Sequence, residues 1–304
     1  MKVFDLHCDT VGECCKNNLP LFNSGLHFSL EKAKMYEEYV QVFAVWIPDE
    51  LRGDDAVSYF NGVADYFYKE TEINKDIVSL YDENTVTPVK AILSVEGASA
   101  CGGTIDGLLN LHKKGVKIIT LTWNGKNEIA SGAFSEGGFT DFGKEFVKTA
   151  EELGIVLDVS HLNRRSFFEF LNIAEKPFIA SHSNADIVNN KYALKRNLTD
   201  EQIRAVKSAN GIVGLNYCRD FIENEGVFGI EALAQQIRHF VSLGCEDVIA
   251  LGSDFDGCEI HPELSGVEKL ANVYDVLLND GFERNLIDKI FYENAHRFFS
   301  KRAD

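Results

Sequence analysis

Histidines and carboxylates stand at the ends of short apolar runs in this sequence, where they could bind a metal together. The first such stretch is FDLHCDT, which places His7 and Asp9 two positions apart. Side chains alternate between the two faces of a strand, so we expect His7 and Asp9 to point one way and Leu6 and Cys8 the other. Two ligating groups with one direction favour a metal site, although the stretch alone also fits a surface strand end.

Four further groups of the same chemical kind end other apolar runs: Glu96, His161, His182 and Asp254. Each could be an ordinary core histidine, turn residue or capping carboxylate. The chain has only 8 histidines in 304 residues, however, and chance explains the joint pattern poorly. Imidazole mixed with carboxylate suits zinc, manganese or iron. All six groups exceed the needs of one tetrahedral zinc, whereas two metals that share a carboxylate would use them all.

Eight apolar runs, most of them followed by polar, helix-patterned stretches, must position these groups. The runs cover residues 3–7, 40–47, 89–96, 116–123, 155–161, 178–182, 211–216 and 248–254. Continuously apolar strands that alternate with helices predict a parallel sheet covered on both faces. Eight such units predict a closed (β/α)8 barrel of the TIM type, formed by residues 1–304 as a single domain. The active site of such a barrel lies at the C-terminal ends of its strands.

The helix-like stretches have recognisable ends. Three of them cover residues 141–154, 198–211 and 229–244. Thr140 and Thr199 are expected N-caps, and Gly211 is expected to close the second helix. The alternative fold, an open doubly wound sheet, expects a glycine-rich phosphate loop after the first strand. The sequence has HCDTVGE at that place and no GxGxxG, which favours the barrel.

Composition excludes several classes of protein. With 30 Lys and Arg against 47 Asp and Glu, the net charge is −17, and no basic stripe could follow a nucleic-acid backbone. We find neither a signal-type segment nor an apolar run long enough to span a membrane, and so expect a cytoplasmic protein without a membrane partner. The 7 cysteines include no CxxC pair, which argues against both a disulfide framework and a thiolate zinc site.

Several stretches together resemble one known family. DLHCDT, SVEGA, GGFTDFGKEF, DVSHL, ASHSNA, KRNLTDEQI and GSDFDG occur in that order, and the likeness extends to ENAHRFF near the end of the chain. They resemble the membrane dipeptidase (renal dipeptidase) family of binuclear zinc peptidases, within the metal-dependent amidohydrolases. The resemblance implies two zinc ions, one held by His7 and Asp9 and the other by His161 and His182. Glu96 would bridge the two ions and count among the catalytic residues.

The resemblance also implies roles for three other residues. Asp254 would contact the bridging water, carry protons and face the substrate, and Arg196 would meet the substrate. Trp123 departs from the family, because mammalian members carry a histidine here, in a stretch like LTHN, which assists the substrate carbonyl. Indole donates one hydrogen bond but carries no positive charge near pH 7. Trp123 therefore contacts the substrate differently or simply packs at the barrel mouth.

The resulting hypothesis is a metal-dependent dipeptidase that hydrolyses the peptide bond of dipeptides with a metal-bridging hydroxide. Arg196 would pair with the terminal carboxylate of the dipeptide. One rival is another amidohydrolase that acts on a lactone, a cyclic amide or an N-acyl amino acid. A second rival is a non-catalytic metal-binding barrel, against which the retention of all six groups argues. The resemblance further implies a homodimer and tolerance of a D-residue at the C-terminal position.

Overall fold

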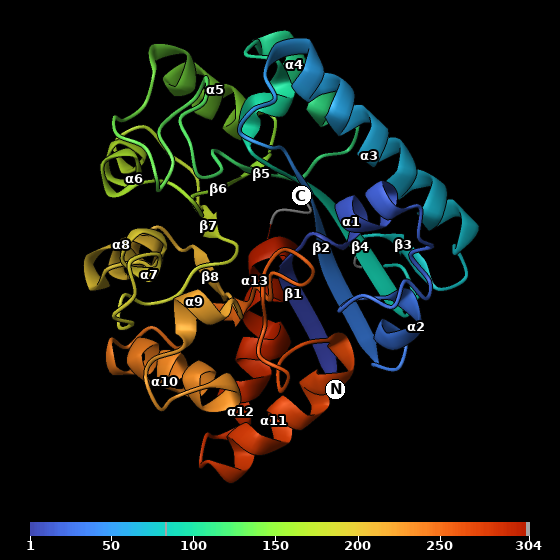
Figure 1. Cartoon of the computed structure of the whole chain (residues 1–304), viewed down its shortest axis with the longest axis vertical. Helices are drawn as coiled ribbons and strands as arrows, with labels where there is room; N and C mark the ends of the chain where they lie inside the picture. Colours follow the sequence, from blue (N-terminus) through green and yellow to red (C-terminus); the bar gives the residue numbers. More distant parts are fainter. Residues whose placement is uncertain (83, 302–304) are drawn as a thin grey trace.

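The strands of the computed structural model close into a parallel barrel, as predicted. The structure describes residues 1–82 and 84–301. Within these residues the ring runs β1, β2, β4, β5, β6, β7, β8, β9 and back to β1 (Figure 1). The strands are β1 (Lys2–Cys8), β2 (Glu38–Trp46), β4 (Val89–Glu96), β5 (Ile118–Thr120), β6 (Val156–Asp158), β7 (Ile179–Ala180), β8 (Ile212–Leu215) and β9 (Ile249–Leu251). All eight apolar runs of the sequence therefore contribute a barrel strand.

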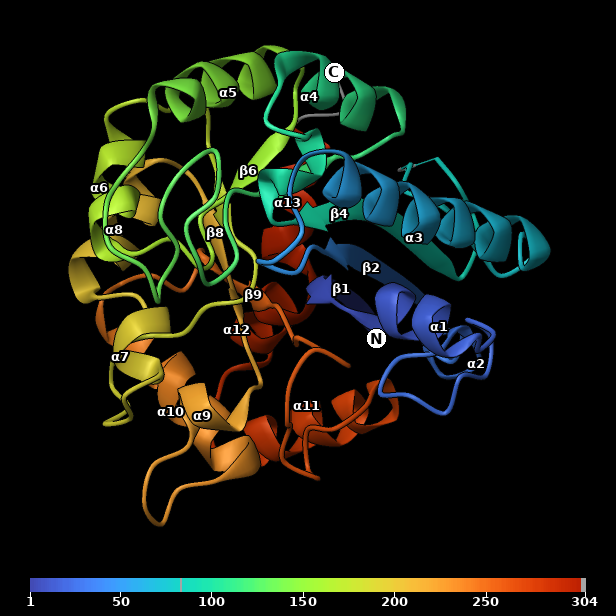
Figure 2. The same ribbon diagram turned by 45° about the horizontal axis from the view of Figure 1, so that its top comes forward.

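Most of the helices surround the barrel on its outside (Figures 1 and 2). The longer ones are α1 (Thr10–Asn17), α3 (Gly53–Ile73), α4 (Ile105–Lys113), α5 (Asp141–Glu152), α6 (Arg164–Leu171), α8 (Asp200–Ser208), α10 (Gly229–Ser242), α11 (Leu270–Asn279) and α13 (Asn294–Ser300). Shorter ones are α2 (Leu30–Ala33), α7 (Ala193–Arg196), α9 (Arg219–Ile222), α12 (Arg284–Asp288), η1 (Ala98–Cys101), η2 (Val267–Lys269) and η3 (Lys289–Glu293). No described helix combines the length and the apolar character needed to cross a membrane.

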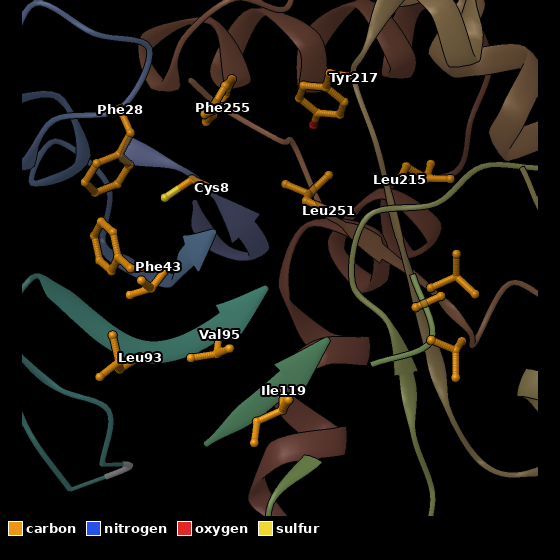
Figure 3. Close-up of a cluster of buried hydrophobic side chains, with 14 of the residues drawn as sticks. Cys8, Phe28, Phe43, Leu93, Val95, Ile119, Leu215, Tyr217, Leu251 and Phe255 are labelled. Carbon is orange, nitrogen blue, oxygen red and sulfur yellow. The ribbon is translucent and has the colours of Figure 1, made fainter. Parts of the chain in front are cut away.

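The strands bury two apolar surfaces, one on each face. The cluster inside the barrel draws on every strand of the ring: Phe4, Leu6, Val40, Val42, Ile92, Ile118, Val156, Ile179, Ile212 and Ala250. The larger cluster lies between strands and helices and includes Phe43, Leu93, Val95 and Ile119 (Figure 3). Because inward positions recur every second residue, the strand that buries Ile92 also directs Glu96 inward, at its C-terminal end. The apolar side chains thus fill the interior of the barrel, and polar side chains line its open C-terminal end, the barrel mouth.

The first strand departs from strict alternation. The pairing of β1 with β2 shifts register between Asp5 and Cys8. As a result Leu6 belongs to the cluster inside the barrel, whereas Cys8 packs in the outer cluster. The expectation that Leu6 and Cys8 share a face is therefore wrong, because an irregularity in a strand redirects the side chains that follow it.

Two other details correct or extend the sequence analysis. Thr140 and Thr199 cap α5 and α8 as predicted, and Thr199 forms a capping box with Gln202. Helix α8 ends at Ser208, however, and the left-handed residue after it is Asn210, not Gly211. An unpredicted short strand, β3 (Val78–Leu80), pairs with the beginning of β4 outside the ring.

Candidate active site

The six strand-end groups identified in the sequence meet at one end of the barrel. They are His7, Asp9, Glu96, His161, His182 and Asp254, all buried except the half-buried Asp9. Each comes from the C-terminal end of its strand or from the residues directly after it. The structure thus brings together, at the C-terminal end of the barrel, the six groups that the sequence analysis expected to meet there.

Glu96 stands at the centre of this group and divides it into two halves. Its Oε2 lies 3.6 Å from His7 Nε2. Its Oε1 lies 2.9 Å from His161 Nε2 and 3.4 Å from His182 Nε2. One carboxylate therefore directs one oxygen toward each half, which is the arrangement needed to bridge two cations.

The half around His7 contains two more carboxylates. His7 Nε2 lies 3.5 Å from Asp9 Oδ2 and 4.0 Å from Asp254 Oδ1. His7 Nε2 and Asp9 Oδ1 are both buried without a hydrogen-bond partner, which is costly for a polar atom unless a cation satisfies it. Asp9 and Asp254 can lie this close together only because residue 257 is a glycine. A Cβ at Gly257 would lie 2.1 Å from Asp9 Oδ2 and 2.5 Å from Asp254 Oδ1.

Asp9 is free to face this site because it does not cap the helix that it precedes. It occupies the N-cap position of α1, where an aspartate normally accepts a hydrogen bond from the helix backbone. Asp9 makes no such side-chain bond. Its backbone N–H instead donates to the carbonyl of Phe255 at 2.9 Å, which ties the end of β1 to the loop after β9.

A hydrogen-bond relay fixes the proton on the imidazole of His182. Ser181 Oγ donates to Asp158 Oδ2 at 2.6 Å, and Thr120 Oγ1 donates to the same oxygen. With its only proton committed to Asp158, the Ser181 oxygen must accept from His182 Nδ1–H at 2.8 Å. His182 Nε2 consequently presents a lone pair to Glu96, as a metal ligand does.

His161 is oriented in a similar way from a strained backbone position. Its Nδ1 lies 3.0 Å from Asn124 Oδ1, which can only accept, so Nε2 again carries the lone pair. Its φ of 68° lies in the left-handed region, which few non-glycine residues adopt. The Nε2 atoms of His161 and His182 are only 2.8 Å apart. Two lone pairs at this distance from each other and from a carboxylate repel unless a cation lies among them.

The electrostatics of the cluster also indicate missing positive charge. Burial raises the pKa of Asp9 to about 7 and lowers the pKa of His161 to about 3. Burial alone would also lower the pKa of His7, but Glu96 and Asp9 hold it well above its usual range. His7 in turn holds the pKa of Glu96 well below its usual range, against the effect of burial. Burial and close approach thus shift the pKa values of these groups in opposite directions, and the mixed imidazole and carboxylate donor set fits divalent cations.

Asp254 is held with one oxygen toward the cluster. Asn216 Nδ2 donates to its Oδ2 at 2.8 Å, while Oδ1 is the oxygen near His7. Its φ of 61° is again left-handed. Burial raises the pKa of Asp254, but the nearby His182 and His7 outweigh that effect and keep the pKa below its usual value. The carboxylate is therefore ionised and able to accept a proton.

Arg196 is brought to the same site from the end of α7, the short helix that follows β7. Its guanidinium is buried, and Nη2 donates to the backbone carbonyl of His182 at 3.3 Å. The guanidinium carbon lies 5.3 Å from the ring centre of Phe221, while Nε has no hydrogen-bond partner. A buried cation with an unused donor is equipped to bind an anionic group.

Trp123 is half-buried and lines the same cavity. Its ring lies 5.0 Å from that of Trp46 at 71°, and 6.4 Å from that of His161. It therefore packs at the barrel mouth and also faces the space above the site. The cavity encloses about 980 Å³ and is lined by Asp9, Glu96, His161, Arg196 and Asp254 among others.

Sequence reasoning missed the residues that hydrogen-bond to the six groups or to their neighbours: Asn124, Asp158, Ser181, Asn216 and Asp256. Asp256, for example, accepts from the backbone N–H of His27 at 2.7 Å and from the hydroxyl of Thr10, next to Asp9. Asp158, Ser181 and Asp256 lie within three positions of a predicted ligand, whereas Asn124 and Asn216 follow β5 and β8, the two ring strands besides β2 that end without one. Polar residues directed into an otherwise apolar strand, as in IVLDVSH, were the available signal.

One family model and several known proteins resemble this chain. A family model described as membrane dipeptidase (peptidase family M19) matches residues 1–304. An uncharacterised protein from the pqqA 5' region of Klebsiella pneumoniae is 30% identical over 215 residues, which is 67% of this chain and 78% of the relative. An uncharacterised dipeptidase of Schizosaccharomyces pombe is 31% identical over 193 residues, 61% of this chain but only 45% of the relative.

Two solved structures share the fold over nearly the whole chain. A metallo peptidase from Rhodobacter sphaeroides, liganded with a phosphinate mimic of the dipeptide L-Ala-D-Ala, has a TM-score of 0.90 at 23% identity and covers 99% of both chains. A dipeptidase of family M19 has a TM-score of 0.91 at 24% identity, over 99% of this chain and 98% of the other. At such identities the likeness establishes the barrel architecture, and the residues at its mouth must carry any argument about chemistry.

Proposed function

The chain belongs to the membrane dipeptidase family, peptidase family M19, and from this premise we propose that the cluster at the barrel mouth is a two-metal centre that hydrolyses dipeptides. Metal-dependent dipeptide hydrolysis is the activity of the family. The observation that carries the two-metal proposal is the central position of Glu96 between His7 on one side and His161 and His182 on the other. The finer assignments below are part of the same proposal.

We assign His7 and Asp9 to one metal, His161 and His182 to the other, and Glu96 to both. The mixture of imidazole and carboxylate supports zinc. Two divalent ions would make a water molecule nucleophilic near neutral pH and polarise the substrate carbonyl. The charge balance supports two ions rather than one. With the imidazoles neutral, the three negative charges of Asp9, Glu96 and Asp254 exceed the two positive charges of a single divalent cation.

The protein residues then divide the remaining work. Asp254, ionised and oriented by Asn216, accepts the proton of the attacking water and passes it to the leaving nitrogen. Arg196 pairs with the terminal carboxylate of the substrate and places the amide above Glu96. Trp123 lies where it can contact the substrate near His161.

The first test is metal content together with turnover. Purified protein is expected to hold about two metal ions per chain, and chelation should abolish hydrolysis of a dipeptide panel until zinc is restored. Lactones, cyclic amides and N-acyl amino acids, assayed in parallel, should be poor substrates. Elemental analysis that finds one ion, or dipeptide turnover that is insensitive to chelator, would contradict the two-metal centre.

The second test concerns the buried guanidinium. Arg196→Ala should raise KM for dipeptides with kcat largely kept, if the contact with the carboxylate is equal in ground and transition states. Amidation of the substrate C-terminus should harm the wild type far more than this variant. Lys195→Ala, which removes the exposed neighbouring cation, is the matched control and should leave KM unchanged. Equal sensitivity to capping in wild type and Arg196→Ala would remove Arg196 from the substrate site.

A further inference from the structure

The cavity above the site has two chemically different walls. One, which we name the arginine wall, consists of Arg196, Cys218 and Phe221 from the segments after β7 and β8. The other, which we name the tryptophan wall, consists of Trp46, Pro48, Tyr59, Val63 and Trp123. It is built from the end of β2, helix α3 and the segment after β5.

The two walls lie on opposite sides of the barrel. In a ring of eight strands ordered β1, β2, β4, β5, β6, β7, β8, β9, strand β2 is directly across from β7. Figure 1 likewise places β2 and β4 on one side of the molecule and β7 and β8 on the other. Trp46 ends β2, next to Glu96 in the strand pairing, and Arg196 donates a hydrogen bond to the carbonyl of His182, two residues after β7. The line from Arg196 across the metal ligands therefore leads to Trp46.

This placement sets the direction of a bound dipeptide. With its carboxylate on Arg196 and its amide above Glu96, the N-terminal residue must extend toward the tryptophan wall. Its amino group then approaches the acidic end of that wall, where Asp9 and Glu13 line the cavity. The side chain of the N-terminal residue meets the indole rings.

The tryptophan wall is suited to a large apolar side chain. The rings of Trp46 and Trp123 lie edge to face at 5.0 Å, and both remain half-exposed toward the cavity. Tyr59 adds a third half-exposed ring. A bulky side chain would bury this aromatic surface, whereas glycine or alanine would leave it in water.

A cationic side chain is the competing occupant, because tryptophan rings also attract cations. The carboxylate nearest the rim, however, is already paired: Glu13 accepts from Lys16 Nζ at 3.2 Å and from Asn17. Lys16 itself lines the cavity and offsets the charge of Glu13. The exposed carboxylate of the cavity that is left, Asp220, lies on α9 beside the arginine wall and not beside the tryptophan wall.

We propose that the tryptophan wall selects dipeptides whose N-terminal residue carries a large aromatic or aliphatic side chain, with Trp46 and Trp123 as the specificity-determining residues. This inference rests on the proposed function, since it assumes dipeptide hydrolysis with the carboxylate on Arg196. It adds a substrate class that the metal ligands alone do not define.

The test compares kcat/KM for Phe-Ala, Ala-Ala, Lys-Ala and Ala-Phe, each with L- and D-configured C-terminal residues, on zinc-loaded enzyme. The wild type should favour Phe-Ala over Ala-Ala by about 10-fold or more, the usual scale for filling an apolar pocket. Trp46→Leu and, independently, Trp123→Leu should each reduce that ratio several-fold. Phe228→Ala, which removes an exposed aromatic side chain that does not line the cavity, should keep the ratio.

The outcomes separate this inference from the function on which it rests. Hydrolysis of no dipeptide would overturn the proposed function. Hydrolysis of Ala-Ala without preference for Phe-Ala, or preference for Lys-Ala, would overturn only the selection of apolar side chains. An unchanged Phe-Ala to Ala-Ala ratio in both folded leucine variants, with circular dichroism like that of the wild type, would remove the two tryptophans as determinants.

Discussion

Replacing His182 with alanine is expected to reduce dipeptide turnover by about 10³-fold or more while the barrel stays folded. The imidazole faces Glu96 beside His161, so in the proposed two-metal centre its loss should empty one metal position and impair the joint action of the two ions. The fold should survive because the apolar layer of the barrel lies beneath the site. The measurements are kcat/KM and elemental analysis. The metal content should fall from about two ions per chain toward one.

His112→Ala provides the matched control for this experiment. His112 is exposed on α4 and does not line the cavity, so both turnover and metal content should equal those of the wild type. Ser181→Ala tests the relay behind His182, and a loss of about 10–100-fold is expected because partners that orient a ligand have effects of that size. A His182→Ala protein with full metal content and near-normal turnover would refute the ligand assignment.

The positions of the ligating groups could be read from the sequence because they follow from the architecture. Once eight apolar runs alternate with helices, the ends of the runs must meet at one end of a barrel. His161 and Asp254, for example, come together although 93 positions separate them in the chain. Neither side-chain packing nor exact strand length was needed for that inference, because the C-terminal ends of parallel strands share one edge.

The orientation of those groups could not be read in the same way. The register shift in β1 moves Leu6 and Cys8 to different sides, and nothing in the composition of FDLHCDT announces it. The proton on His182 depends on Ser181 and Asp158, which meet only because β6 and β7 pair in the register observed. The direction of a hydrogen bond depends on tertiary geometry. Strand periodicity therefore predicts which side chains lie close together, but not which nitrogen of a histidine carries the proton.

The role of Trp123 shows where resemblance and geometry must be combined. The family resemblance identified the position as a departure, in LTWN, but offered only packing or an altered substrate contact. The structure places Trp123 against Trp46, which the sequence analysis did not single out, and both line one cavity. Where mammalian members use a histidine on the substrate carbonyl, Trp123 instead packs on Trp46. The two rings together define a surface that neither residue forms alone.

Replacing Asp254 with asparagine is expected to lower kcat by about 10²–10⁴-fold, the usual scale of general acid–base catalysis, with modest change in metal content. Asparagine keeps the shape and can still accept the hydrogen bond from Asn216, but it cannot take up a proton. Asp106→Asn, an exposed residue of α4, is the control and should retain full activity.

The same variant can distinguish proton transfer from metal binding by Asp254, whose Oδ1 also lies 4.0 Å from His7 Nε2. An amine leaves poorly without a proton, whereas the alkoxide of the corresponding depsipeptide ester leaves with much less assistance. The loss of kcat caused by Asp254→Asn can be compared on the ester and on the dipeptide with the same side chains. If Asp254 delivers the proton, this loss should be at least about 10-fold smaller on the ester. If Asp254 instead holds a metal, the deficits should be equal on both substrates and metal content should fall. The ratio of the two losses of kcat, measured at saturating zinc, therefore decides whether the Asp254 carboxylate transfers a proton or binds a metal.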